Sequence, residues 1–167
     1  MDTQTIELLG RHRLANELLQ AGLEVASPLR DRGVDLIAYA DIDKQVGRFV
    51  AKPIQMKAAS QRSFGIWQKY LKIHNLIFAF VWNLDGKAEA ETYALTSDEA
   101  IAVGTAMGWT RTPSWLQDGG YSTTRPGAKM CELLQQHRMT PERWWGKVVG
   151  SSKQRAVERG DEADEAR

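Results

Sequence analysis

The sequence predicts an α/β fold in which an amino-terminal helix precedes a central mixed sheet. Apolar residues recur at near-helical spacing from about residue 5 to residue 21 and stop at Gly22, a helix end signal. Residues 34–39 and 76–82 are nearly continuous apolar runs bounded by turn-forming residues, as expected of buried strands. The predicted core has the order helix, three strands, helix, strand (αβββαβ), with one more strand after it.

Two further strands and a second helix complete the first part of this core. Strands are expected at residues 23–26 and 48–57, and Pro53 in the second of them requires an edge position or a bulge because it has no amide hydrogen. Residues 63–73 suit a helix, although Gly65 weakens its start.

Turn and capping signals order the middle of the chain. Residues 41–44 are expected to form the turn after the second strand, and residues 83–86 a turn that leads to a strand at residues 91–95. Residues 96–99 have the form of a capping box, which predicts a helix at residues 100–107.

Helical patterns dominate the carboxy-terminal part. Residues 109–124 are expected to form a loop, and residues 126–139 a helix. Thr140 and Pro141 suit the cap and the first position of a short helix that carries two adjacent tryptophans.

The chain is expected to have three parts. Residues 1–95 form the core, residues 96–150 form a helical, tryptophan-containing extension packed on it, and residues 151–167 form a disordered tail without an apolar pattern. The adjacent Trp144 and Trp145 either lock the extension onto the core or form a subunit contact.

Composition favours one ordinary soluble domain. The 167 residues are 43% hydrophobic and 26% charged, with a net charge of +1. No run of eighteen apolar residues indicates a membrane span, and the first residues lack the pattern of a signal peptide, so we expect a cytoplasmic protein. Cys131 is the single cysteine, which excludes an internal disulfide and predicts a small buried side chain in a helix.

Charge is distributed unevenly along the chain. Between residues 44 and 74 the sequence has no acidic residue and seven basic ones, namely Lys44, Arg48, Lys52, Lys57, Arg62, Lys69 and Lys72. Such a stretch suits either a solvated face or contact with a polyanion.

Polar side chains interrupt two of the predicted strands. Asp35 stands at the front of the second strand, and Gln55 and Lys57 alternate with apolar residues on the third. Because side chains alternate faces along a strand, Gln55 and Lys57 are expected to point the same way. The three side chains then form a polar cluster suited to a bound ion, unless Asp35 is only a turn residue and the pair lies on a solvated edge.

This order of elements and residues resembles the PD-(D/E)XK nuclease superfamily over residues 6–82. The motif residues are Gly33-Val34-Asp35 and Gln55-Met56-Lys57, a Gln-x-Lys variant, and the likeness is greatest to small Holliday-junction-resolvase-like, restriction and homing endonucleases. The resemblance implies a restriction-endonuclease-like core and a DNA endonuclease that depends on Mg²⁺, with Mn²⁺ as a substitute. A homodimer is expected, since two related sites can cut both strands of a duplex.

The resemblance also implies roles for individual residues. Asp35 would be the principal metal ligand, Gln55 a neutral oxygen ligand in place of the usual acid, and the backbone carbonyl of Met56 a further ligand. Lys57 would activate the attacking water and stabilise the phosphate oxygens. Where relatives place an acid after glycine on the first helix this chain has Arg11, so Glu7, or alternatively Glu17, completes the set; the expected DNA contacts are Arg11, Lys52, Gln61, Arg62, Lys69 and Lys72.

Two alternatives belong to other functional classes. The first is a noncatalytic nucleic-acid-binding module that kept the fold and its basic face but lost the metal through Gln55 and Arg11. The second is an interaction protein that uses its tryptophan-rich carboxy-terminal part.

Overall fold

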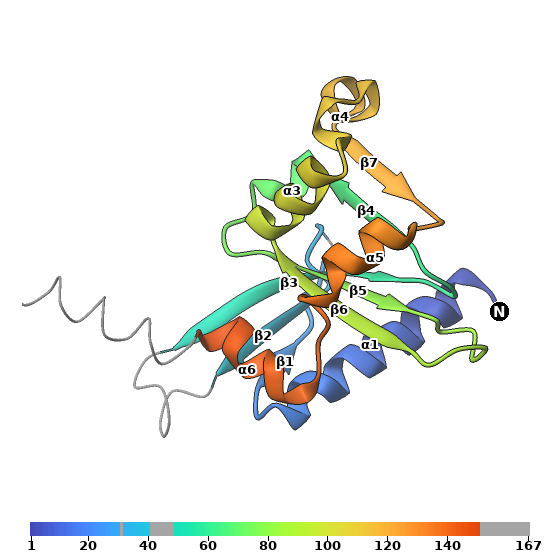
Figure 1. Ribbon diagram of the computed structural model, residues 1–167. Helices are drawn as coiled ribbons and strands as arrows, with labels where there is room; N and C mark the ends of the chain where they lie inside the picture. Colours follow the sequence, from blue (N-terminus) through green and yellow to red (C-terminus); the bar gives the residue numbers. More distant parts are fainter. Residues whose placement is uncertain (31, 41–48, 151–167) are drawn as a thin grey trace, which may run out of the picture.

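A mixed five-stranded sheet forms the centre of the computed structural model, which describes residues 1–30, 32–40 and 49–150 (Figure 1). Its strand order is β1-β2-β3-β5-β6, in which β3 and β5 are parallel and all other neighbours are antiparallel. The strands are β1 (Glu24–Ala26), β2 (Leu36–Ala40), β3 (Val50–Ala58), β5 (Ile77–Trp82) and β6 (Glu91–Thr96). The predicted α/β class, with an amino-terminal helix and a mixed sheet, is confirmed.

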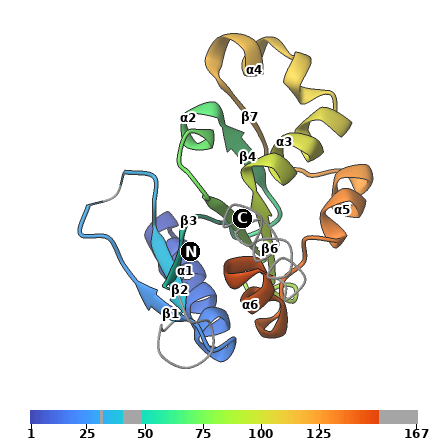
Figure 2. The same cartoon turned by 90° about the vertical axis from the view of Figure 1, so that its left-hand side faces the viewer.

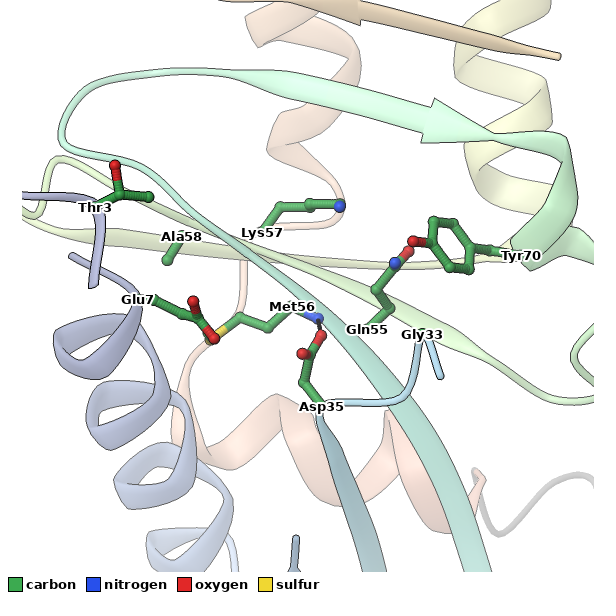
Figure 3. Close-up of a pocket in the computed structure, with 9 residues that line it drawn as sticks. All are labelled: Thr3, Glu7, Gly33, Asp35, Gln55, Met56, Lys57, Ala58 and Tyr70. Atoms are coloured by element: carbon green, nitrogen blue, oxygen red, sulfur yellow. Dashed lines mark hydrogen bonds between the residues drawn. The ribbon is translucent and has the colours of Figure 1, made fainter. Parts of the chain in front are cut away.

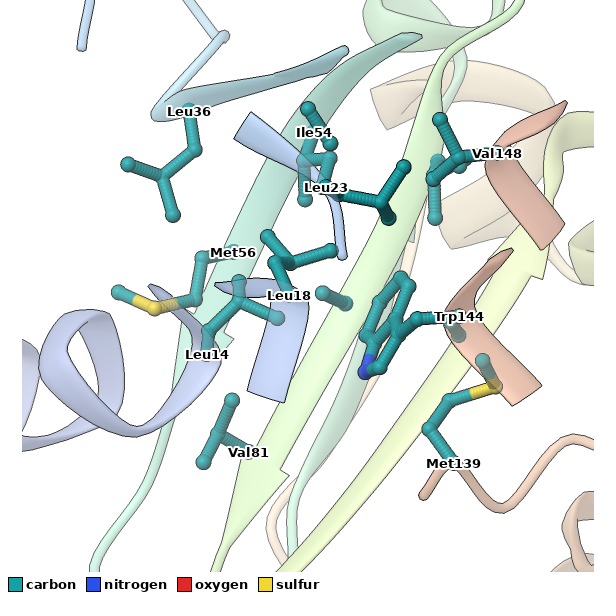
Figure 4. Packing of buried hydrophobic residues seen from close by; sticks show 14 of the residues in the cluster. Leu14, Leu18, Leu23, Leu36, Ile54, Met56, Val81, Met139, Trp144 and Val148 are labelled. Atoms are coloured by element: carbon teal, nitrogen blue, oxygen red, sulfur yellow. The ribbon is translucent and has the colours of Figure 1, made fainter. Parts of the chain in front are cut away.

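Helices cover both faces of this sheet (Figure 2). On one face α1 (Thr3–Gln20) and α6 (Pro141–Val149) pack over a cluster that includes Leu14, Ile54 and the fully buried Trp144 (Figure 4). On the other face α3 (Ser97–Ala106) and α5 (Ala128–Gln135) pack over a second cluster built around Phe78 and Phe80. Trp144 therefore ties α6 to the core.

Helix α1 approaches β3 very closely, and this approach determines what lies over the end of the strand. The side-chain oxygen of Asp2 accepts the Thr5 amide at 2.8 Å and starts the helix. A Cβ at Gly10 would lie 2.6 Å from the Cβ of Ala58, so only glycine allows this contact. The residues flanking Gly10 on α1 are thus held beside the carboxyl end of β3.

Pro53 lies inside β3 at a place where the strand has one neighbour. The pairing with β2 includes Pro53 opposite Ile37, whereas the pairing with β5 begins only at Ile54. The first half of β3 is therefore an edge on the β5 side, where a missing amide hydrogen costs no ladder bond. This confirms the expectation that Pro53 requires an edge.

The helix predicted at residues 63–73 is wrong in its first half. Residues Phe64–Trp67 form a strand, β4, which is followed by a single helical turn, α2 (Gln68–Leu71). Phe64 and Ile66 are buried while Trp67 is exposed, a period of two that the sequence prediction missed. β4 pairs with β7 (Gly120–Thr123) in a separate two-stranded sheet.

The predicted loop at residues 109–124 is also wrong. It contains β7, a one-turn 3-10 helix η2 (Trp109–Arg111) and the short helix α4 (Pro113–Asp118). Tertiary pairing with β4 gives β7 its strand form, which local sequence does not reveal.

Several capping predictions hold. Thr96 and Glu99 form the reciprocal bonds of a capping box at α3, and Pro141 occupies the first turn of α6. α5 ends earlier than predicted. Arg138, which the prediction placed in this helix, instead forms an isolated antiparallel β-bridge with Tyr93 of β6. The predicted turn at residues 41–44 and the predicted tail at residues 151–167 lie outside the described residues.

Among the residues that the structure describes, no helix is long and apolar enough to cross a membrane.

Candidate active site

Gln55 and Lys57 project from the same face of β3, as their spacing predicts. In the parallel pairing they lie opposite Phe78 and Phe80, which belong to the cluster under α3. Ile54 belongs to the cluster under α1, on the opposite face. The strand therefore turns an apolar face toward α1. On its opposite face, near the carboxyl end, it carries the polar side chains of Gln55 and Lys57.

Asp35 is fixed to β3 by backbone bonds immediately before β2 begins. Its amide donates to the Ile54 carbonyl at 2.8 Å, and its carboxylate Oδ2 accepts the Met56 amide at 2.7 Å (Figure 3). A carboxylate that accepts a backbone amide keeps one orientation, so Asp35 is held beside the Gln55-Met56-Lys57 segment. The two motif segments, which are twenty residues apart in sequence, are thus joined directly.

These residues line one pocket of about 250 Å³, which we call the site pocket (Figure 3). Its charged and amide side chains are two carboxylates, one amide and one ammonium group. The lining residues are Thr3, Glu7, Gly33, Asp35, Gln55, Met56, Lys57, Ala58 and Tyr70. The structure brings together Asp35, Gln55, Met56, Lys57 and Glu7 of the predicted site.

Gln55 carries an oxygen atom whose surroundings leave it without a hydrogen bond. The residue is only 3% exposed, and its Oε1 has no partner among the described residues. A buried carbonyl oxygen without a partner costs about 1–3 kcal/mol, so such atoms are rare in structural roles. Amide oxygens are ligands for hard cations, and Oε1 would reach one in the site pocket only after the Gln55 side chain turns.

The donor set fits a magnesium-like ion with few protein ligands. Asp35 and Glu7 supply carboxylate oxygens and Gln55 supplies an amide oxygen, all lining the site pocket. In the described part of the chain, no three His, Cys, Asp or Glu side chains form a metal-binding group. A cation here would keep several water ligands, which Mg²⁺ tolerates well.

Tyr70 is a pocket residue that the sequence analysis missed. The Nζ atoms of Lys57 and Lys69 lie 5.6 Å and 4.8 Å from its ring centroid, within range of a cation–π interaction. A Cβ at Gly33, whose φ is +90°, would lie 2.4 Å from a ring carbon of Tyr70. The ring thus occupies space that only a glycine at position 33 leaves open. The one sequence signal for Tyr70 was an aromatic residue next to the basic Lys69.

Arg11 pairs with both carboxylates of the site pocket. Its Nη2 lies 3.2 Å from Glu7 Oε1 and 3.8 Å from Asp35 Oδ1, and its Nη1 donates to the Asp35 carbonyl at 2.9 Å. The Asp35 side chain is 13% exposed and that of Glu7 is 55% exposed. Arg11 therefore offsets part of the negative charge of these two carboxylates.

The structure places Glu17, the alternative metal ligand, away from the site pocket. It is buried, and its oxygens accept from Thr92 and Trp144 at 2.8 Å and 3.0 Å. Both oxygens are already used inside the protein, so Glu17 has a structural role rather than a role in the pocket.

None of the remaining predicted contacts lines the site pocket, and Lys52 lies on the face of β3 opposite Gln55 and Lys57. Gln61 and Arg62 are exposed and line a neighbouring pocket, and Lys69 lies beside Tyr70. Lys52 is half-buried on β3 and lines neither pocket, while Lys72 is exposed at the end of α2. Lys44 and Arg48 of the basic stretch lie outside the described residues.

Comparisons with protein-family models, curated proteins and solved structures found no match to this chain.

Proposed function

We propose that this protein is a divalent-metal-dependent DNA endonuclease, with Mg²⁺ as the ion and Mn²⁺ as a substitute. The supporting observation is the site pocket, in which Asp35, Gln55 and Lys57 line one cavity. Carboxylate and amide oxygens beside an ammonium group suit a metal and a phosphodiester together.

Each side chain has a distinct task in this proposal. Asp35, Gln55 and Glu7 would hold the ion, with the Met56 carbonyl as a further ligand. An ion held there would supply charge neutralisation for the phosphate and a lowered pKa for the attacking water. Lys57, which lines the same pocket, would stabilise the charge that develops on the phosphate oxygens. Tyr70 keeps the Lys57 ammonium group near the cavity through the contact at 5.6 Å.

Arg11 favours the second candidate, a noncatalytic nucleic-acid-binding module. Its guanidinium group lies within 3.8 Å of a carboxylate oxygen of both Glu7 and Asp35, and so already offsets part of the charge that attracts a cation. If this pairing persists in solution, the pocket binds phosphate through Arg11 and Lys57 without a metal. Metal affinity therefore separates the two candidates.

A cleavage assay with a matched lysine pair tests the proposal. Duplex, single-stranded and branched DNA are incubated with wild type, Lys57→Ala and Lys52→Ala in Mg²⁺, Mn²⁺ or EDTA. We expect cleavage that requires the metal, and about a 100-fold loss of rate in Lys57→Ala, the size seen when one charge-stabilising donor is removed. Lys52, an expected DNA contact, lies instead on the opposite face of β3 and lines neither pocket, so Lys52→Ala removes the same charge from the same strand and should keep near-normal rates.

Two results would contradict the endonuclease proposal. The first is the absence of cleavage of all three DNA forms in both metals. The second is equal loss of rate in the two lysine variants, which would mean that charge alone matters. The size of the protein in solution, measured with and without duplex DNA, tests the proposed homodimer.

A further inference from the structure

A second pocket of about 390 Å³ continues from the site pocket. The two pockets share Thr3, at the first turn of α1, and Ala58, at the end of β3. The two pockets are therefore neighbours, with Thr3 and Ala58 between them.

The two pockets have opposite chemical character. The site pocket is lined by the carboxylates Glu7 and Asp35, whereas none of the residues that line the second pocket is acidic. Its polar lining consists of hydroxyl, amide and guanidinium groups that can donate to an anion, from Thr3, Ser60, Gln61, Arg62, Ser63 and Thr124. One pocket thus suits a cation and its neighbour suits an anion.

Arg62 retains charge for a ligand although it has an acidic neighbour. Glu91 lies 3.8 Å from Arg62 Nη2, and its other oxygen lies 3.5 Å from Arg138 Nη1. Arg62 therefore shares the Glu91 carboxylate with Arg138, which also has Glu89 at 3.9 Å from its Nη2, so Glu91 offsets only part of the charge of Arg62. The Arg62 side chain is 53% exposed and reaches the pocket without burying its charge.

We propose that the second pocket binds the phosphodiester next to the one held in the site pocket, so that the ligand is a nucleic-acid strand with two consecutive phosphates. Arg62 is the main phosphate contact, and the surrounding hydroxyls donate to phosphate or sugar oxygens. This inference rests on the proposed function, because it assumes that a nucleic-acid strand occupies the site pocket.

Three small ligands separate the contribution of the second phosphate from that of the second nucleoside. Thymidine 5′-phosphate has one phosphate and one nucleoside, the dinucleotide dTpdT has one phosphate and two nucleosides, and pdTpdT has two of each. Affinities are measured in Ca²⁺ by NMR titration of the full chain with wild type, Arg62→Gln and Arg138→Gln. Arg138 is the matched control because it pairs with the same Glu91 but does not line the pocket.

Wild type should bind pdTpdT about tenfold more tightly than either ligand with one phosphate, the gain expected from one charged hydrogen-bonded contact. Arg62→Gln should abolish this gain and reduce the slope of log affinity against log salt by about 0.7, as for one single-strand phosphate contact. Arg138→Gln should keep both the gain and the slope.

Equal affinities of wild type for pdTpdT and dTpdT would overturn the inference, as would equal effects of the two arginine variants or no binding at millimolar ligand. The titration needs no cleavage, so its outcome is separate from that of the nuclease assay. A protein that fails to cut DNA but keeps the second-phosphate gain would lose only the proposed endonuclease activity.

Discussion

Two glutamates on the same helix lie in opposite environments. Glu17 is 6% exposed, and its oxygens accept from Thr92 Oγ1 and Trp144 Nε1 at 2.8 and 3.0 Å, while Arg13 Nε lies 3.0 Å away as an ion-pair partner. Glu7, ten residues earlier, has a 55% exposed side chain and pairs with Arg11 at the mouth of the site pocket. Each glutamate has an arginine four residues away on α1, yet only Glu17 connects different parts of the fold.

The difference distinguishes structural polar groups from binding groups. The Glu17 cluster joins α1, β6 and α6, and all its acceptor atoms are used within the protein. The site pocket is lined by Gln55, whose Oε1 is buried without a hydrogen bond in the described structure. A satisfied buried network stabilises one fold, whereas a buried oxygen without a hydrogen bond costs stability.

Removing Glu17 should have the largest effect on stability. Glu17→Ala leaves Trp144 Nε1 and Thr92 Oγ1 buried without their acceptor and Arg13 without its carboxylate, so we expect a loss of about 3 kcal/mol in the free energy of unfolding. Glu7→Ala removes an exposed i,i+4 pair and should cost less than about 1 kcal/mol. Urea unfolding of the two variants measures the difference, and equal losses would mean that Glu17 and Glu7 contribute equally to the free energy of unfolding.

Changing Gln55 should exchange stability for metal affinity. Gln55→Leu removes the unpaired buried oxygen and should leave stability unchanged or raise it by about 1 kcal/mol, while abolishing metal binding. Gln55→Glu places a carboxylate at a site that is only 3% exposed, so it should destabilise the metal-free protein and bind Mn²⁺ more tightly.

Thermal unfolding with and without Mn²⁺, together with calorimetric titration, checks both Gln55 variants. The Glu variant should gain more in unfolding temperature on adding metal than wild type does. If Gln55→Leu proves strongly destabilising, Oε1 has a structural hydrogen-bond partner in solution and is not held for a ligand.

The sequence was sufficient to predict the strands of the site and their facing. Asp35, Gln55 and Lys57 could be grouped because strand side chains alternate with a fixed period, and the structure brings all three to one pocket. The expectation that Pro53 lies at an edge or a bulge also came from a local property, because proline has no amide hydrogen to donate.

Other features depend on tertiary contacts that one sequence does not encode locally. β4 and β7 are strands because they pair across more than fifty residues, and Tyr70 joins the pocket because its ring lies against Gly33. The choice between Glu7 and Glu17 depended on which helix turn faces β3 and which faces Trp144. Helical spacing alone leaves both residues as candidates.

Releasing the pocket carboxylates from Arg11 should strengthen metal binding with little effect on stability. Arg11→Gln removes the guanidinium group that lies 3.2 Å from Glu7 and 3.8 Å from Asp35, so we expect severalfold tighter Mn²⁺ binding. The partly exposed pairs should contribute less than about 1 kcal/mol to unfolding. Arg11→Lys, which keeps a cation, is the control, and an unchanged Mn²⁺ affinity in Arg11→Gln would mean that the pairing does not compete with the metal.

Acid should weaken the fold through a second buried polar cluster, and this is the smallest of the expected effects. Burial lowers the pKa of His137 below its ordinary value of 6.5, although the Glu99 carboxylate 3.8 Å from Nδ1 opposes the shift. Burial alone would raise the pKa of Glu99, but the hydrogen bond from Lys147 at 2.6 Å and the other favourable contacts outweigh it and hold that pKa below 4.5.

Both shifts have the same sign for stability. As the pH falls through 6.5 the unfolded chain protonates at residue 137 while the folded protein does not, so the free energy of unfolding decreases. The contribution of Glu99 is present above 4.5 and is lost as the pH falls through its folded pKa. Urea unfolding at pH 7.5, 6.5 and 5.5 should show a decline in wild type that is reduced in His137→Gln, and parallel declines in the two proteins would assign the acid sensitivity to other groups.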